Sequence, residues 1–230
     1  MKLSSLSILI PAYNDKKTIA RVVNRARDAG QLYAKRFEIV VCNDASPDLP
    51  ASVLTALKRS IPEMRIMTHK KNQGYGGTLK DLYFEGKNEW LFTIPGDYQI
   101  DPMELRKLLP LTDAGDMIIG WRKVRFDSQA RKLQSVVYNG LLRCMYGIRL
   151  HDINSVRLMK RSIIEGRYIA STSAFVDAEL TIGAIRDGFR VIEYPIKHRK
   201  RETSGAGGGK LSVILPVIFD MVRYKLHSMV

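Results

Sequence analysis

Short apolar runs alternate with more polar stretches along most of the chain. The runs predict strands over 6–10, 37–42, 64–69, 90–94, 116–120, 156–159 and 190–198. The stretches between them predict helices from Asp15 or Thr18 to Gly30, through Leu54 to Arg59, and over 78–86, 102–109, 134–146 and 176–187. This alternation is typical of an α/β fold, with a mostly parallel central sheet and helices on both faces.

The C-terminal part departs from this pattern. Residues 199–210 are basic and rich in glycine, and they show no apolar periodicity. Residues 211–219 are apolar, but Asp220, Arg223 and Lys225 follow, so the run is shorter than the roughly 20 residues that cross a bilayer. We therefore divide the chain into one domain over 1–210 and a C-terminal helix over 211–230. That helix either packs on the domain, which is slightly favoured, or lies on a membrane surface.

Composition narrows the possible partners and compartments. The 230 residues carry a net charge of +14, which favours an anionic partner: nucleic acid, an anionic membrane surface or a phosphorylated small molecule. Cys42 and Cys144 are far apart and form no metal-like or redox pair, so a reducing compartment is the simpler inference. The N-terminal apolar run, interrupted by serines and lacking a cleavage pattern, predicts a strand and not a signal peptide.

Polar side chains follow three of the predicted strands, where ligands gather in an open parallel sheet. The clusters are Tyr13-Asn14-Asp15, Asn43-Asp44 and Asp97-Tyr98-Gln99. Asp97 and Gln99 are two residues apart, so in extended chain both face one ligand, and their oxygens suit Mg²⁺ or Mn²⁺. Taken singly, each cluster is also good turn or helix-cap chemistry. The Gly74-Tyr75-Gly76-Gly77 loop allows close backbone approach but is not a dinucleotide fingerprint.

The order of these segments resembles the family-2 glycosyltransferases of GT-A fold, specifically the polyprenyl-phosphate sugar synthases similar to dolichol-phosphate-mannose synthase. The segments that carry the resemblance, over nearly the whole chain, are 7–14, 38–46, 72–76, 96–102, 120–122, 138–139, Gly147, Asp152, 175–180, 188–191 and 193–196. The resemblance implies an inverting enzyme that moves a hexose from a UDP- or GDP-linked sugar to a polyprenyl phosphate, with Mg²⁺ or Mn²⁺ as cofactor.

The resemblance also implies residue roles. Donor-binding residues would be Pro11, Tyr13, Asp44, Gly74, Arg122, Asp152 and Ser155. Metal ligands would be Asp97 and Gln99; the catalytic set would be Asp97, Asp177 and Glu179; the acceptor phosphate would be gripped by Arg199, Arg201 and Lys210. The chain departs from the family at Pro95, where the first Asp of the metal motif usually stands, and the 199–210 loop is looser than the usual arginine-glycine-serine-lysine pattern.

The acceptor decides whether a general base is needed. A polyprenyl phosphate is already anionic, whereas a hydroxyl acceptor must lose its proton to a carboxylate such as Asp177 or Glu179. The alternative for this pair is capping or surface charge, since residues two apart share no helical face. The basic excess and the apolar, basic tail favour the lipid phosphate, because each basic residue near an anionic surface contributes about 1 kcal/mol.

We therefore expect a cytoplasmic enzyme, peripheral at the inner face of the membrane, with a membrane-anchored partner subunit as a reasonable hypothesis. Two alternatives stay open: a glycosyltransferase with a soluble or polysaccharide acceptor, and a non-catalytic nucleotide-sugar-binding subunit, which Pro95 favours. Nucleic-acid binding explains the charge but not the polar clusters, and no interleaving of aromatic and basic residues supports it.

Overall fold

A computed structural model describes residues 1–49, 51–126, 128–202 and 211–227. Within these residues seven strands form one sheet, in the order β3-β2-β1-β4-β6-β5-β7. The strands are β1 (Leu3–Ala12), β2 (Ala34–Asn43), β3 (Met64–Thr68), β4 (Trp90–Thr93), β5 (Met117–Trp121), β6 (Arg157–Lys160) and β7 (Val191–Pro195). β6 runs antiparallel to both of its neighbours, β4 and β5, and the other pairs are parallel. The predicted, mostly parallel sheet is confirmed.

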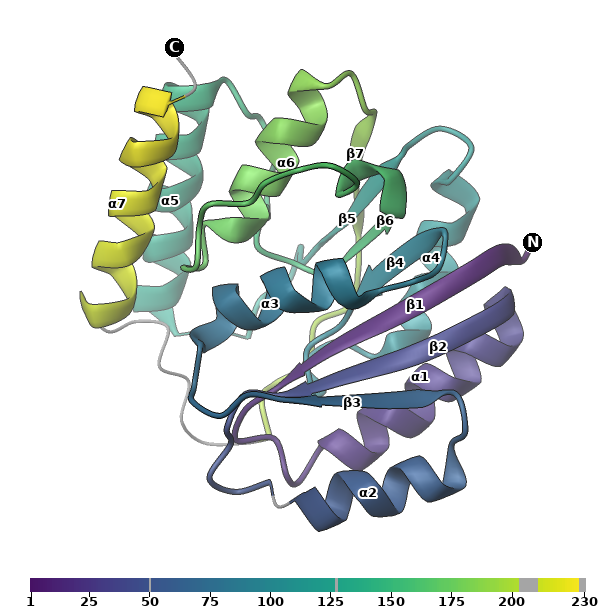
Figure 1. The fold of residues 1–230 in the computed structure, drawn as a ribbon. Coiled ribbons are helices and arrows are strands. Elements are labelled where there is room, and N and C mark those ends of the chain that lie inside the picture. Colours follow the sequence, from purple (N-terminus) through teal and green to yellow (C-terminus); the bar gives the residue numbers. More distant parts are fainter. Residues whose placement is uncertain (50, 127, 203–210, 228–230) are drawn as a thin grey trace.

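Helices cover both faces of the sheet (Figure 1). They are α1 (Ile19–Tyr33), α2 (Ala51–Ser60), α3 (Gly74–Glu85), α4 (Leu105–Leu108), α5 (Gln129–Tyr146), α6 (Val176–Arg186) and α7 (Leu211–His227). Side chains of β1 alternate between the two faces, as extended chain requires. Leu6, Ile8 and Ile10 pack with α1 and α4, whereas Leu9 packs in a second core with α3 and α6. Burial on both faces explains why the strands read as continuous apolar runs.

Several predicted boundaries were wrong, each for a local reason. The glycine-rich segment is the first turn of α3, whose start is held by Asp44, and Gly74 at that start takes a positive φ of 73°. The helix predicted over 102–109 is broken into a 3₁₀ turn at Pro102–Glu104, α4, and a second 3₁₀ turn at Leu109–Leu111. α5 begins at Gln129, five residues early, because the Ser128 side chain accepts the backbone N–H of Arg131.

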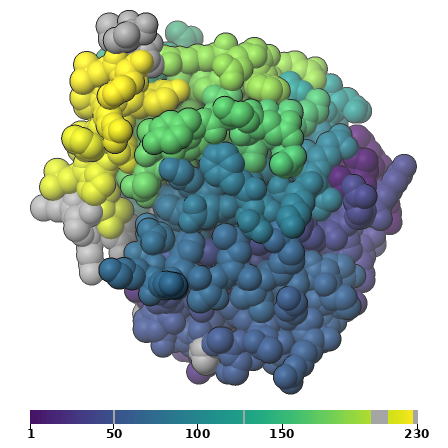
Figure 2. Space-filling view, viewed as in Figure 1, coloured from purple at the N-terminus to yellow at the C-terminus, as the bar shows by residue number. Residues whose placement is uncertain are grey.

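The last helix lies beside α5 (Figure 1). Met221 is buried in a third core with Leu142, Phe175 and Ile182, and the Lys225 ammonium donates to the Met145 carbonyl at 2.7 Å. The other face of α7 stays open: Leu215, Phe219, Val222 and Leu226 are exposed, and Figure 2 shows this helix along one edge of the molecule in yellow. Thus α7 packs on the domain and also presents an apolar face. Among the described residues, no helix has both the length and the apolar content to span a membrane.

Candidate active site

A cavity of about 1180 Å³ opens where β1, β2 and β4 end. It collects most of the predicted site residues: Pro11, Tyr13, Asp44, Gly74, Asp97, Gln99, Arg122, Asp152, Ser155 and Arg201. These residues come from segments spread over nearly the whole chain. The prediction that the polar clusters meet at the carboxyl edge of the sheet is therefore confirmed.

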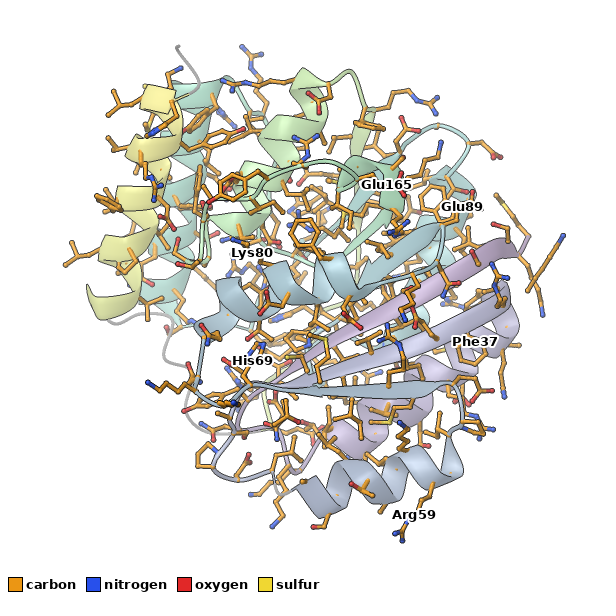
Figure 3. The ribbon with its side chains drawn as sticks, in the orientation of Figure 1. Phe37, Arg59, His69, Lys80, Glu89 and Glu165 are labelled. Atoms are coloured by element: carbon orange, nitrogen blue, oxygen red, sulfur yellow. The ribbon has the colours of Figure 1, made fainter. Side chains whose placement is uncertain are left out.

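Asp44 follows β2 and holds the start of α3. Its carboxylate accepts the backbone N–H groups of Gln73 at 2.7 Å and Gly74 at 2.9 Å. These are orphan donors of a helix N-terminus, which favours a negative charge. His69, just beyond β3 (Figure 3), lies between two carboxylates, with Nδ1 2.7 Å from Asp44 and Nε2 3.1 Å from Asp81. Sequence analysis did not identify His69, because the strand predicted over 64–69 included it, whereas β3 ends at Thr68.

Asp97 follows β4 and faces a second carboxylate, that of Asp15. Oδ1 of Asp97 accepts the Gln99 backbone N–H at 3.0 Å, and Oδ2 lies 3.7 Å from Nε of Arg201. Burial raises the pKa of Asp15 to about 7, and the negative charge of Asp97 adds to this rise. Asp15 or Thr18 was predicted to cap the helix; Thr18 occupies the N-cap position, and the Asp15 side chain faces Gly96.

Backbone strain gathers beside these carboxylates. In the described part of the chain, the non-glycine residues with positive φ are Asn14 (59°), Ala45 (52°) and Tyr98 (58°). Each adjoins one site carboxylate in sequence: Asp15, Asp44 or Asp97. Such conformations cost about 1–3 kcal/mol each and cluster at functional sites. A residue in this conformation therefore adjoins each of the three carboxylates that line the cavity.

Arg122 and Asp152 form a bidentate ion pair on the wall of the cavity. Nε and Nη2 of Arg122 lie 2.6 and 2.7 Å from the two oxygens of Asp152. Glu193 accepts the Asp152 backbone N–H at 3.0 Å and so fixes the loop that carries it. The Ser155 hydroxyl is buried nearby without a hydrogen-bond partner. Ser155 thus offers an unused hydroxyl at the cavity.

Asp177 and Glu179 were predicted near the reaction centre, or else as surface charge. Both are buried, and neither is among the described residues that line the cavity. Oδ1 of Asp177 lies 3.0 Å from Nη2 of Arg157 and accepts the Tyr83 hydroxyl at 2.6 Å. Glu179 accepts the backbone N–H groups of Ala170 and Ser171 at 2.8 and 2.9 Å. Their carboxylates hold the fold, and the predicted surface position was wrong.

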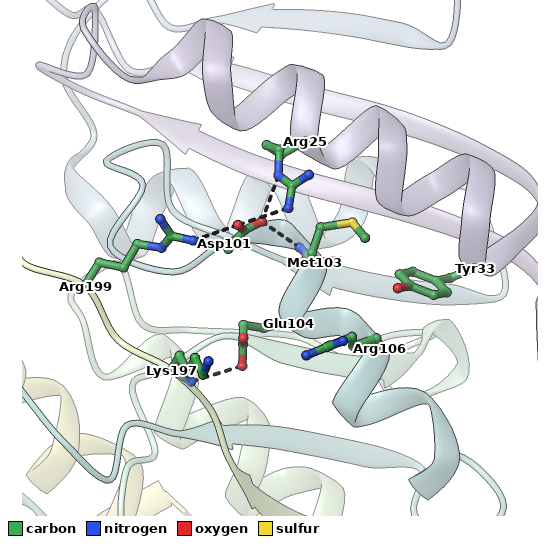
Figure 4. A pocket seen from close by; sticks show the side chains of 8 residues that line it. All are labelled: Arg25, Tyr33, Asp101, Met103, Glu104, Arg106, Lys197 and Arg199. Atoms are coloured by element: carbon green, nitrogen blue, oxygen red, sulfur yellow. Dashed lines mark hydrogen bonds and ion pairs between the residues drawn. The ribbon is translucent and has the colours of Figure 1, made fainter.

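The three predicted acceptor residues separate in the structure. Arg201 lines the cavity, whereas Arg199 belongs to a smaller pocket beside α1 (Figure 4). There Nη2 of Arg199 lies 2.9 Å from Oδ2 of Asp101, which Arg25 also contacts, and the guanidinium lies over the Tyr98 ring. Lys210 lies outside the described residues. Arg125 and Arg131 also line the large cavity and add positive charge to it.

The far wall of the cavity is apolar. It is formed by α5 and α7 through Leu133, Val137, Leu141, Val213, Val217, Ile218 and Met221. Leu133 and Val137 are more than half exposed, so this wall continues onto the molecular surface. The cavity therefore joins a charged floor to an apolar exit.

The donor set fits a hard divalent cation held together with a diphosphate. Asp97 and Gln99 offer oxygen ligands, and Oδ1 of buried Asp15 has no hydrogen-bond partner beside them. Across the described ranges, no group of three or more His, Cys, Asp or Glu side chains is arranged to hold a metal ion. A cation at this cavity would thus need ligands from the substrate as well.

Comparison with curated proteins finds relatives that act on polyprenyl phosphates. The chain is 28% identical over 222 residues to the undecaprenyl-phosphate 4-deoxy-4-formamido-L-arabinose transferase of Edwardsiella ictaluri, covering 94% of this chain and 66% of that protein. It is 26% identical over 234 residues to the dodecaprenyl-phosphate galacturonate synthase of Rhizobium johnstonii, covering 96% and 68%. The chain thus spans about two thirds of the length of these relatives.

Solved structures confirm the GT-A fold. Glucosyl-3-phosphoglycerate synthase from Mycobacterium tuberculosis, in complex with Mn²⁺, UDP and phosphoglyceric acid, superposes with a TM-score of 0.73 at 13% identity, covering 96% of this chain and 78% of that one. The same enzyme with Mg²⁺ and UDP gives a TM-score of 0.70 at 13% identity, covering 94% and 79%. The model of the family described as Glycosyl transferase family 2 matches residues 7–167, and the chain therefore belongs to this family.

Proposed function

We propose that the protein is an inverting glycosyltransferase that moves a hexose from a nucleoside-diphosphate sugar to a polyprenyl phosphate. One observation carries the proposal: the cavity joins the carboxylates at the strand ends to the apolar wall of α5 and α7. A lipid phosphate needs both surfaces, a charged one for its headgroup and an apolar one for its chain. The names of the polyprenyl-phosphate relatives support the same substrate class.

The donor would occupy the strand-end half of the cavity. Pro11, Tyr13, Asp44 and Gly74 would hold the nucleoside, whose base is uracil or guanine. Arg122, Asp152 and Ser155 would contact the sugar and diphosphate. Because Asp152 already neutralises Arg122 through two short contacts, this pair would serve mainly to fix the position of the guanidinium.

Asp97 and Gln99 would hold Mg²⁺ or Mn²⁺ against the diphosphate. When bound, the cation would offset the charge that develops on the departing nucleoside diphosphate. Arg201, close to Asp97, would add positive charge on the same side of the cavity. The acceptor oxygen would attack the anomeric carbon from the opposite side, which inverts its configuration.

Displacement by a phosphate oxygen needs no general base, because that oxygen is ionised at neutral pH. The structure favours this acceptor over a hydroxyl, since the two predicted bases, Asp177 and Glu179, are buried in contacts with other protein groups. Arg201, Arg125 and Arg131 would attract the acceptor phosphate.

We also propose that the protein works at the inner face of the membrane as a peripheral, cytoplasmic enzyme. The open apolar face of α7 and the net charge of +14 support contact with an anionic bilayer. A membrane-anchored partner subunit would be a second means of holding the enzyme there. We expect no binding of nucleic acid.

The direct test is transfer from labelled UDP- and GDP-sugars to polyprenyl phosphate with Mg²⁺ or Mn²⁺. Lipid-linked sugar is the expected product, and Asp97→Ala, correctly folded by circular dichroism, should lower its rate by 100-fold or more, roughly the cost of losing a charge-stabilising group. Asp113→Asn, an exposed carboxylate away from the cavity, is the matched control. Transfer only to water-soluble acceptors, or donor binding without turnover, would support the two alternatives instead.

A further inference from the structure

The carboxylate of Asp15 is held against the loop that lacks the family's first metal-motif Asp. A Cβ atom placed on Gly96 would lie 2.9 Å from Oδ2 of Asp15, and Gly96 directly follows Pro95. Two hydrogen bonds fix this contact: the Thr18 hydroxyl donates to the Gly96 carbonyl at 2.7 Å, and the Gly96 N–H donates to the Pro11 carbonyl at 3.2 Å. Asp15 is thus fixed beside the position where the usual carboxylate is missing.

The hydrogen bonding of this carboxylate is incomplete. Oδ2 accepts the backbone N–H of Tyr13 at 3.1 Å, but Oδ1 is buried without any partner, and the residue is only 5% exposed. A buried carboxylate oxygen without a donor costs free energy that the fold must offset elsewhere. Such an atom at the wall of a cavity points to a ligand that completes it.

Other carboxylates of the cavity already have cationic or hydrogen-bonding partners. Asp152 pairs with Arg122, and Asp44 accepts from His69 and the start of α3. Arg201 lies 3.7 Å from Asp97, and its positive charge also acts on Asp15. Asp15 Oδ1, buried without a hydrogen-bond partner, lines the same cavity as Asp97 and Gln99, so their oxygen atoms together could serve as ligands of a divalent cation.

We propose that Asp15 takes the place of the carboxylate lost at Pro95 and, with Asp97 and Gln99, completes the protein ligands of the divalent cation. This assignment rests on the proposed use of a cation with the nucleoside diphosphate. Mg²⁺ and Mn²⁺ sites of this kind need one or two carboxylates, with phosphate oxygens and water as the remaining ligands. Asp15 would then supply, from the loop after β1, the carboxylate ligand that Pro95 cannot.

Binding of Mn²⁺, followed by the electron paramagnetic resonance signal of the free ion, tests this without any sugar transfer. The titration is run with UDP and separately with GDP, on the wild type, Asp15→Asn, Asp97→Asn and the control Asp113→Asn. We expect Asp15→Asn and Asp97→Asn each to raise the Mn²⁺ dissociation constant about tenfold or more, and Asp113→Asn to leave it unchanged. Calorimetric binding of the same nucleotide in EDTA should stay the same in Asp15→Asn, and its thermal unfolding should show an intact fold.

Restoring the usual carboxylate gives a second, independent arm. In Pro95→Asp, adding Asp15→Asn should weaken Mn²⁺ binding far less than it does in the wild type, because the new carboxylate replaces the lost one. Three results would overturn the proposal: no Mn²⁺ binding by the wild type, wild-type Mn²⁺ binding by Asp15→Asn, or equal loss of nucleotide binding in EDTA. Mn²⁺ binding that depends on Asp15 in a protein without transferase activity would instead overturn only the proposed function.

Discussion

Nη2 of Arg157 lies 3.0 Å from Oδ1 of Asp177, in an ion pair whose side chains are both 1% exposed or less. Arg157 stands on β6 and Asp177 at the start of α6, so the pair joins the sheet to the helix above it. Asp177→Asn or Arg157→Met leaves the partner buried and uncompensated, so each should lower the free energy of unfolding by about 3–5 kcal/mol in urea titrations. The double variant Arg157→Met/Asp177→Leu should lose less unfolding free energy than the two single variants lose together. Loss of turnover by Asp177→Asn at full stability would return that residue to the catalytic set.

Replacing Gly76 in α3 tests how closely this helix packs, and Gly140 in α5 is the matched control. A Cβ at Gly76 would overlap the backbone carbonyl of Ser173, whereas a Cβ at Gly140, inside α5, would meet nothing within 4 Å. Gly76→Ala should lower the unfolding free energy by about 1–3 kcal/mol, since backbone cannot move aside cheaply. Gly140→Ala should raise it by up to about 1 kcal/mol through helix propensity. Equal effects of the two in thermal or urea unfolding would contradict the observed packing.

Separate replacement of Arg199 and Arg201 tests which one serves the acceptor. Arg201→Ala removes positive charge from the cavity and should raise the KM for polyprenyl phosphate about tenfold or more, with a smaller effect on the KM for the donor. Arg199→Ala removes a half-exposed contact to Asp101 and should change stability by about 1 kcal/mol or less. A larger rise in the acceptor KM for Arg199→Ala than for Arg201→Ala would show that Arg199, and not Arg201, serves the acceptor.

The carboxyl of Asp116 gives the stability a defined dependence on pH. Hydrogen bonds from Arg190 and Lys160 hold its pKa well below the ordinary value near 4. A depressed carboxyl pKa adds stability that is complete above the unfolded-state value and is lost as pH falls below it. Urea unfolding of the wild type should therefore weaken steeply below about pH 4. Asp116→Asn should have a lower free energy of unfolding at pH 7, and this free energy should change less with pH in acid than in the wild type. If the variant lost stability in acid as steeply as the wild type, Asp116 would not be the cause of the pH dependence.

The exposed face of α7 can be tested on vesicles. Phe219 and Leu226 are 66% and 61% exposed, and they are seven residues apart, so they share one side of the helix. Phe219→Ser/Leu226→Ser should lower cosedimentation with anionic vesicles about tenfold or more, because two large side chains no longer leave water. Leu32→Ser, at an exposed position of α1, is the control and should bind like the wild type. Equal binding by the two variants would place the membrane contact elsewhere.

Much of the fold was predictable because burial on both faces leaves each strand as an apolar run. The edge at which Asp44 and Asp97 line one cavity was also predictable, since ligands gather at the ends of parallel strands, whereas Arg201 was predicted only from the family resemblance. Contacts that depend on three-dimensional packing were not predictable. Gly76 lets the Ser173 backbone pack closely against α3, and Asp177 forms a buried ion pair with Arg157. A charged residue inside the apolar run 156–159 was the available sign that a buried partner existed.

The bond between the Thr18 hydroxyl and the Gly96 carbonyl has a consequence for how substrates are received. It ties the loop after β1 to the loop after β4, so a hydrogen bond within the protein holds together the two segments that would meet the nucleoside diphosphate. Little chain entropy then remains to be lost when the donor arrives in this half.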